Sequence, residues 1–167
     1  MSKQNDISFD DIAKDILNGK KFNILDKEVH HGITRYSHIM RVSKATYNIT
    51  KKLKMDYVSA TRAALLHDYY TESDLSDVEG LYNRWKDHPE IAYNNAKEEF
   101  NLNDKEKNMI ESHMFPMGNI MPKYKESWTL SLIDKGISTY EQYKNNWKPI
   151  IGVYIIFVIN MIMFGQK

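Results

Sequence analysis

The chain of 167 residues contains no cysteine. This absence excludes a disulfide framework and a catalytic thiol, and it fits a reducing compartment. Proline and glycine are scarce, with four and seven residues, and apolar residues recur at spacings of three and four rather than in alternation. The sequence therefore predicts an all-α fold. Basic and acidic residues are nearly balanced, 23 against 22, so the charge gives no reason to expect a nucleic acid polymer as a partner.

Apolar periodicity predicts where the helices lie. We expect helices over about residues 7–17, 34–53, 55–68, 103–113 and 125–143, and a second short element from Phe22. Residues 70–85 are polar and include a glycine, which predicts a connection with about one helical turn. Pro89 suits the first turn of a helix, so we expect that helix to begin at His88. The spacing of Val42 and Ile49 predicts that both face the interior, as does His38.

The dipeptide His67–Asp68 follows the apolar run 63–66. Burying an imidazole and a carboxylate costs free energy unless something binds them, and a divalent metal ion binds both. A lone histidine on an apolar face is more often a hydrogen-bonded core residue, but few cores need four histidines and two aspartates. The candidate metal ligands are His38, His67, Asp68, His88, His113 and Asp134.

The order of His38, His67–Asp68 and Asp134 resembles the HD superfamily of metal-dependent phosphohydrolases. The matching segments are RYSHIMRVS, AALLHD and SLIDK. His88 and His113 resemble the two extra histidines of its dinuclear branch, which includes bacterial diadenosine tetraphosphate hydrolases and HD-GYP cyclic-dinucleotide phosphodiesterases. With the HHG segment at 30–32, the pattern is similar to a small group of uncharacterised bacterial HD-domain hydrolases.

Two features depart from these relatives. Many dinuclear members carry a lysine three residues after the HD pair, where this chain has Thr71. The GYP elements are also missing, which argues against a cyclic-dinucleotide phosphodiesterase. The group that anchors a phosphate must then come from elsewhere in the chain.

The resemblance implies a helical bundle with a metal site between its helices. Two divalent ions are expected, with iron or manganese favoured and zinc, nickel or magnesium also suited to these ligands. Asp68 would bridge the ions, His38 and Asp134 would complete one shell, and His88 and His113 would complete the other. A hydroxide shared by the ions would attack a nucleotide or another small phosphate ester.

The transition state of phosphoryl transfer needs further positive charge. Arg35, three residues before His38, and Lys135, beside Asp134, are the catalytic candidates. Candidates for substrate binding are Lys123, Lys125 and His31. A solvated surface charge, or plain packing for His31, is the alternative interpretation.

Two other functions stay open at this point. Some HD-fold proteins with the same six ligands are di-iron oxygenases, and the ligand types alone do not separate the two chemistries. A metal-stabilised signalling module without catalysis is the third alternative.

The sequence divides into an N-terminal helical extension (1–27), a hydrolase domain (28–143) and an apolar tail (149–164). The N-terminus lacks the basic segment and apolar core of a signal peptide, so we expect a cytoplasmic domain. The tail, PIIGVYIIFVINMIMF, has no charged residue and would form about 24 Å of helix, less than the roughly 30 Å of a bilayer core. Trp147 and Lys148 before it suit a membrane interface. We expect a membrane anchor, with a buried or dimer-forming helix in a homo-oligomer as the alternative.

Overall fold

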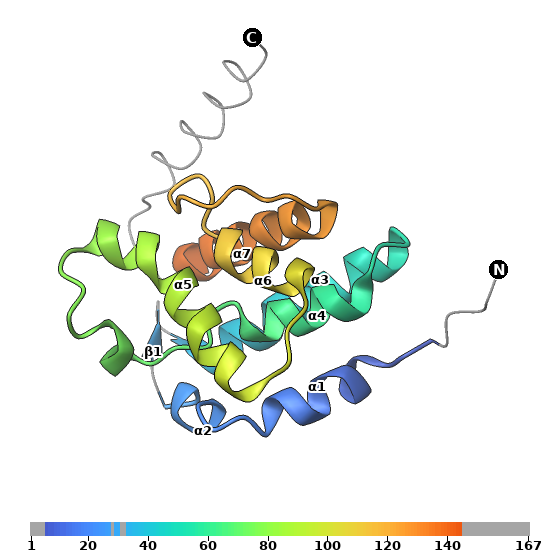
Figure 1. Cartoon of the computed structure of the whole chain (residues 1–167), viewed down its shortest axis with the longest axis horizontal. Helices are drawn as coiled ribbons and strands as arrows, with labels where there is room; N and C mark the ends of the chain where they lie inside the picture. Colours follow the sequence, from blue (N-terminus) through green and yellow to red (C-terminus); the bar gives the residue numbers. More distant parts are fainter. Residues whose placement is uncertain (1–5, 28, 31–32, 145–167) are drawn as a thin grey trace, which may run out of the picture.

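The structure, a computed structural model, describes residues 6–27, 29–30 and 33–144, which are largely helical (Figure 1). The helices are α1 (Phe9–Leu17), α2 (Phe22–Leu25), α3 (Arg35–Lys52), α4 (Tyr57–Leu66), α5 (Leu81–Glu99), α6 (Asp104–Ser112) and α7 (Lys125–Lys144). A 3-10 turn, η1 (Glu72–Leu75), follows α4, and two short antiparallel strands, β1 (Val29–His30) and β2 (Ile33–Thr34), precede α3. The predicted all-α fold is confirmed.

Four of the helices begin at a residue whose side chain caps the first turn. Ser8, Thr34, Asp56 and Asn103 each accept a hydrogen bond from the backbone N–H three residues later. Such a bond satisfies a donor that has no partner inside the helix. Glu106 completes a capping box with Asn103. Local side-chain chemistry therefore fixes where these helices start.

Helix α4 lies at the centre of the bundle. It packs against α3, α1 and α6, and α3 also packs against α7. In Figure 1, α1 and α2 lie on one side of this central pair and α7 lies on the other. Ala60, Ala63, Ala64, Leu65 and Leu66 are fully buried, as expected for a helix covered on most of its faces. The chain that leaves α4 therefore enters the interior of the molecule.

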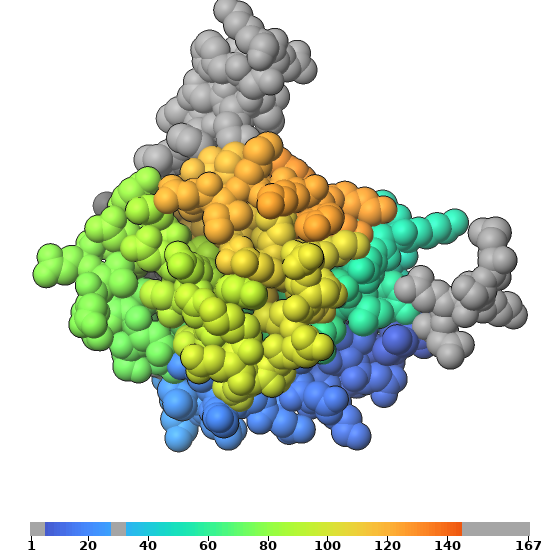
Figure 2. Space-filling model, viewed as in Figure 1, coloured from blue at the N-terminus to red at the C-terminus, as the bar shows by residue number. Residues whose placement is uncertain are grey.

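The N-terminal helices belong to the same core. Ile16, Phe22 and Leu25 are buried in one apolar cluster with residues of α4. Figure 2 shows the blue N-terminal segment packed directly against the green and yellow segments. The expected extension over residues 1–27 thus contributes core side chains to the bundle where it is described.

Helix α5 differs from the sequence-based expectation. It begins at Leu81, not at His88, and Pro89 lies inside it. Proline in a helix interior cannot donate a hydrogen bond to the carbonyl one turn earlier, here that of Trp85. Trp85, Ala92 and Ala96 nevertheless recur at helical spacing around His88, and Ala92 and Ala96 are fully buried. The one helical turn expected in the preceding connection is present as η1.

The buried stripe of α3 also differs from expectation. Val42 is fully buried, but Ile49 is 40 % exposed, and Thr46 and Thr50 take the interior position instead. The hydroxyl of Thr50 donates to the carbonyl of Thr46 at 2.6 Å, which satisfies one polar group in the core. The prediction that Ile49 faces the interior was therefore wrong, because it considered only apolar residues as candidates for burial.

Within the described ranges, no helix is both long and apolar enough to cross a membrane. The apolar tail over residues 149–164 lies outside those ranges, and so does His31.

Candidate metal centre

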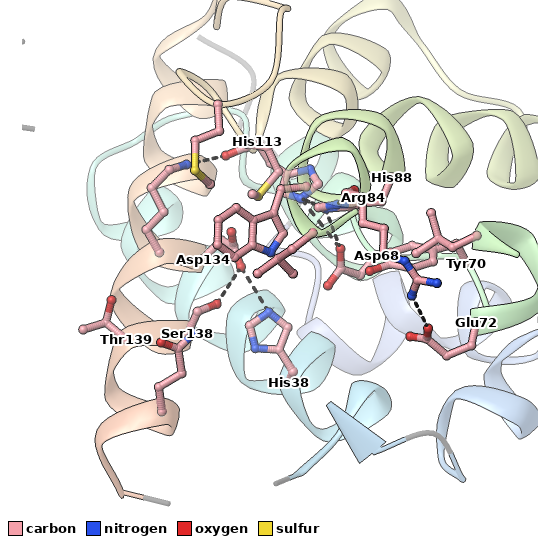
Figure 3. Close-up of a pocket in the computed structure, with 17 residues that line it drawn as sticks. His38, Asp68, Tyr70, Glu72, Arg84, His88, His113, Asp134, Ser138 and Thr139 are labelled. Carbon is pink, nitrogen blue, oxygen red and sulfur yellow. Dashed lines mark hydrogen bonds and ion pairs between the residues drawn. The ribbon is translucent and has the colours of Figure 1, made fainter. Parts of the chain in front are cut away.

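The structure brings all six candidate ligands together in the interior. Figure 3 shows His38, Asp68, His88, His113 and Asp134 around one cavity. They come from five helices or the residues that follow them: His38 from α3, His67 and Asp68 after α4, His88 from α5, His113 after α6 and Asp134 from α7. None of the six is more than 6 % exposed. Five separate segments therefore deliver nitrogen and oxygen donors to one buried place.

One group of donors is formed by His38, His67 and Asp134. Oδ1 of Asp134 lies 3.0 Å from Nε2 of His38 and 3.6 Å from Nε2 of His67. The three ligand atoms lie within 4.8 Å of one another. Donors around one divalent ion, each about 2.0–2.2 Å from it, are separated by similar distances.

The second group surrounds the carboxylate of Asp68. Its Oδ2 lies 3.6 Å from Nε2 of His67. Its Oδ1 lies 3.4 Å from Nε2 of His88 and 3.7 Å from Nε2 of His113. The two oxygens of Asp68 thus face different imidazoles, which suits a carboxylate that is shared between two ions.

Backbone carbonyls fix the ring orientation of three of these histidines. Nδ1 of His67, His88 and His113 lies within 2.8–2.9 Å of a carbonyl oxygen three or four residues earlier in the chain. A carbonyl can only accept a hydrogen bond, so Nδ1 carries the proton in each ring. In the neutral imidazole, Nε2 then presents a lone pair to the centre.

These lone pairs have no hydrogen-bond donor to meet. Nε2 of His88 and Nε2 of His113 face one another at 2.9 Å. Among the described residues, Nε2 of His67 and Oδ1 of Asp68 are buried without a hydrogen-bond partner. Electron pairs that converge in a buried space need an electron-pair acceptor, and the donor set of imidazole and carboxylate fits a divalent cation.

The protonation states of His88, His113 and Asp68 agree with this fit. Burial lowers the pKa of His113 to about 3 and also lowers the pKa of His88, so both rings are neutral at neutral pH. Burial would raise the pKa of Asp68, but the nearby His67, His88 and His113 outweigh burial and hold that pKa below its usual value. Neutral imidazole and ionised carboxylate are the forms that bind metal ions.

His38 has a carboxylate behind it that the sequence analysis did not single out. Its Nδ1 donates to Oε2 of Glu141 at 2.8 Å, and Arg41 holds the other oxygen of Glu141 at 2.8 Å. Burial lowers the pKa of His38, but Asp134 and Glu141 outweigh it and raise the pKa to about 10. The raised pKa means that the ring of His38 carries a second proton at neutral pH, and a bound divalent ion would displace that proton. Glu141 lies two helical turns after Asp134 on α7, and that spacing was the available signal.

A cavity of about 220 Å³ opens beside the ligands. Its apolar lining consists of Leu75, Leu81, Trp85, Met114 and Met117. Helix α7 adds the polar side chains of Ser138, Thr139 and Gln142. Among the described residues, the charged side chains outside the ligand set that line it are those of Arg84, Glu72 and Lys135. A small organic group with one charged end matches this lining.

The two predicted catalytic cations have other tasks in this geometry. Lys135 lines the cavity, but its ammonium donates to the carbonyl of His113 and to the hydroxyl of Ser131, both at 2.5 Å. Arg35 is fully buried and does not line the cavity. Its guanidinium lies over the ring of Tyr70, 4.0 Å from the centroid, and pairs with Glu72 at 2.6 Å.

The structure does not bring Lys123 or Lys125 to the cavity. Both are exposed, and neither lines it. Asn108 binds the backbone of Met121 and of Lys123, at 3.2 and 2.8 Å, and so fixes this loop away from the ligands. Neither of these lysines is therefore placed to bind a substrate in the cavity.

Arg84 and Trp85 line the cavity and were missed by the sequence analysis. The reason is the late start assigned to α5, which left both residues in a supposed connection. Arg84 lies four residues before His88, and this spacing places the two on one helix face. Thr71, by contrast, caps η1 and binds Asp74 at 2.9 Å.

No curated protein and no solved structure matches the chain. Comparison with known families matches residues 35–136 to the HD domain, which is more than half of the chain and contains all six candidate ligands. Proteins with this domain are in general metal-dependent hydrolases. The chain belongs to the HD domain family.

Proposed function

We propose that the protein is a metal-dependent phosphohydrolase that holds two divalent ions and cleaves a nucleotide or another small phosphate ester. The observation that carries this proposal is the buried convergence of imidazole lone pairs and the Asp68 carboxylate beside an open cavity. Iron and manganese are the metals we favour, because both accept a mixture of imidazole and carboxylate ligands.

His38, His67 and Asp134 would hold one ion, and Asp68, His88 and His113 would hold the other. Asp68 is placed between the groups and would be shared. Bound divalent ions would supply Lewis acidity toward a phosphoryl oxygen and a lower pKa for a water molecule. The carbonyl bonds to Nδ1 keep three rings in the orientation that binding requires.

The cavity supports a small substrate. Its volume of about 220 Å³ lies below the range of about 300–1,000 Å³ that is usual for drug-sized ligands. The apolar lining, which includes Trp85, would exclude water from part of the cavity. With a phosphate bound at the ions, the organic part of the substrate would contact these apolar residues.

Metal analysis of the purified protein, combined with a phosphate-release screen, tests this function. We expect two ions per chain, loss of activity after chelation, and recovery with Mn²⁺ or Fe²⁺ on at least one nucleotide or sugar phosphate. Asp68→Asn should abolish activity, whereas Asp77→Asn, at an exposed aspartate in the same connection, should not.

A metal-replete protein that releases no phosphate across a broad panel would contradict the proposal. Dioxygen consumption by the iron-loaded protein in the presence of an organic substrate would favour the oxygenase alternative instead.

A further inference from the structure

We propose that Arg84 is the phosphate anchor of this cavity, and that Glu72 and Arg35 position its guanidinium. The inference rests on the proposed function, because it names the residue that would hold the phosphate beside the ions. It concerns a side chain outside the metal ligands, so it can be tested separately from metal binding.

Arg84 lies one helical turn before the ligand His88. The carbonyl of Arg84 accepts the Nδ1–H of His88 at 2.9 Å, which ties the two residues together. Four residues of α-helix advance by about 6 Å, so side chains at this spacing are neighbours on one face. Both line the cavity, and Figure 3 shows Arg84 beside His88 and Asp68. A phosphate near the ions is therefore within reach of the long Arg84 side chain.

Lys135 is the other cation that lines the cavity, and its donors are already engaged. Its ammonium has three N–H donors, and three acceptors surround it: the carbonyl of His113 and both the hydroxyl and the carbonyl of Ser131. Lys135 thus serves to hold the backbone of a ligand in place. A phosphate would have to break these bonds in order to recruit it.

Arg84 keeps donors available. A guanidinium has five N–H donors in a planar fork that matches phosphate oxygens. With the described residues, Arg84 makes two polar contacts, to the carbonyl of Val78 at 3.3 Å and to Oε2 of Glu72 at 3.1 Å. Between these two cavity-lining cations, Arg84 is the one that can add an anion without giving up its present contacts.

Glu72 does not cancel the charge of Arg84, because it is shared. One carboxylate oxygen binds the guanidinium of Arg35 at 2.6 Å and the other binds Arg84 at 3.1 Å. Two guanidinium groups and one carboxylate leave one net positive charge. Arg35, buried against Tyr70, fixes Glu72, and Glu72 then sets the direction of Arg84. Arg35 and Glu72 are positioning residues, and Arg84 is the group that would touch the substrate.

Calorimetric titration of the Mn²⁺-loaded protein with inorganic phosphate tests the proposal. Arg84→Gln should weaken phosphate binding by about 10- to 100-fold, the usual worth of hydrogen bonds to a charged group. Arg84→Lys should recover part of the affinity, since charge remains but the planar fork is lost. Glu72→Gln should change the affinity less than Arg84→Gln does, since it frees the guanidinium of Arg84 but also removes a negative charge beside it. Metal content, measured in parallel, should stay at the wild-type value in all three variants.

The matched control is Lys86→Gln. Lys86 lies two residues further along α5, does not line the cavity and pairs with Asp87 at 3.8 Å. Its replacement should leave phosphate affinity unchanged. Where an ester is hydrolysed, Arg84→Gln should raise KM and the inhibition constant of phosphate more than it lowers kcat.

Phosphate affinity of Arg84→Gln within about twofold of wild type, at full metal content, would overturn the proposal. If that variant loses metal, Arg84→Lys decides, since it keeps the positive charge and must still bind phosphate more weakly than wild type because the planar fork is lost. Metal-dependent phosphate binding that Arg84→Gln weakens, without hydrolysis of any ester, would refute the proposed function and leave this inference standing. Hydrolysis by Arg84→Gln with an unchanged KM and unchanged inhibition by phosphate would refute this inference and leave the proposed function standing.

Discussion

Glu141 acts on the centre without lining the cavity. Its carboxylate binds Nδ1 of His38, and Arg41 holds it from the other side. A carboxylate behind a histidine fixes the ring and makes its second nitrogen a stronger donor to metal. Glu141 is only 2 % exposed, so water cannot replace it easily. The basicity of His38 therefore depends on a residue two turns beyond Asp134.

We predict that Glu141→Gln keeps the fold but weakens binding of one of the two proposed ions. Loss of such an outer partner usually costs about 10- to 100-fold in metal affinity. Competition titration of the metal-free protein with a coloured chelator measures this for each ion. Glu98→Gln, at an exposed glutamate of α5, is the control and should bind both ions as wild type does. Equal affinities in Glu141→Gln and wild type would rule out this role.

Residue identities predicted the ligand types but not their partners. Each candidate histidine could be recognised within its own helix, because the chemistry of imidazole and the apolar setting are local properties. Arg84 and Glu141 could not be recognised in that way. Their roles arise from contacts with Glu72 and His38, which are distant in sequence, and the orientation of Lys135 depends on the carbonyl of His113.

Among the helices, α4 shows how a local signal sets the position of the site. Asp56 caps it by accepting the N–H of Ser59 at 3.1 Å and pairs with Lys105 of α6 at 3.0 Å. Burial would raise the pKa of Asp56, but the bonds from Ser59 and Lys105 outweigh it and lower the pKa. A carboxyl group whose pKa is lower in the folded state stabilises that state above its unfolded pKa of about 3.9.

We predict that Asp56→Ala lowers the free energy of unfolding by about 0.5–2 kcal/mol at pH 7, the usual cost of losing a helix cap. This difference from wild type should shrink as the pH falls below about 4, when Asp56 becomes protonated through its lowered folded pKa. Urea unfolding at several pH values measures it. A difference that persists undiminished after protonation would show that the charge of Asp56 is not what stabilises α4.

The boundaries of the helices were predictable where a cap or a break marks them. A helix was predicted from residue 103, and the structure confirms this start, with Asn103 as the cap and Glu106 completing the capping box. Helix α5 carries Pro89 inside it, and Gly80 precedes it without a side-chain cap, so its start could not be read locally. The interior stripe of α3 was misassigned for a related reason, because its end is buried through the hydrogen-bonded Thr50 rather than through Ile49.

At the scale of the whole molecule, the metal centre and the apolar core are continuous. Tyr69, next to Asp68, binds the backbone N–H of Lys21 at 3.1 Å and the carboxylate of Glu99 at 2.9 Å. The N-terminal segment and α5 thus both restrain the residue beside the carboxylate of Asp68. Metal binding should consequently stabilise the entire fold and not only the site.

We predict that chelation lowers the melting temperature of the metal-replete protein. Ligand at 100 times its dissociation constant adds about 2.7 kcal/mol to the folded state, which corresponds to roughly 5–10 °C for a domain of this size. Scanning calorimetry with and without chelator measures the shift. The shift should be smaller in Asp68→Asn, and identical melting of chelated and replete wild type would contradict the prediction.

The membrane anchor stays a prediction, because the apolar tail over residues 149–164 lies outside the described ranges. We expect the full chain to float with phospholipid vesicles in a density gradient. Ile156→Lys should reduce flotation, since a lysine in the middle of an apolar helix costs about 2.5–3.5 kcal/mol on insertion. Wild-type protein that remains at the bottom of the gradient would exclude the anchor.

His67 and His113 each stand immediately after the last residue of a helix, α4 and α6 respectively. A helix carries about half a negative elementary charge at its C-terminal end. Two such ends therefore add their negative potential to that of Asp68 and Asp134 before any ligand arrives. Such a potential favours cations over phosphate at this centre. We therefore expect metal ions to bind first, and an anionic substrate to follow once they have reversed the sign of the field.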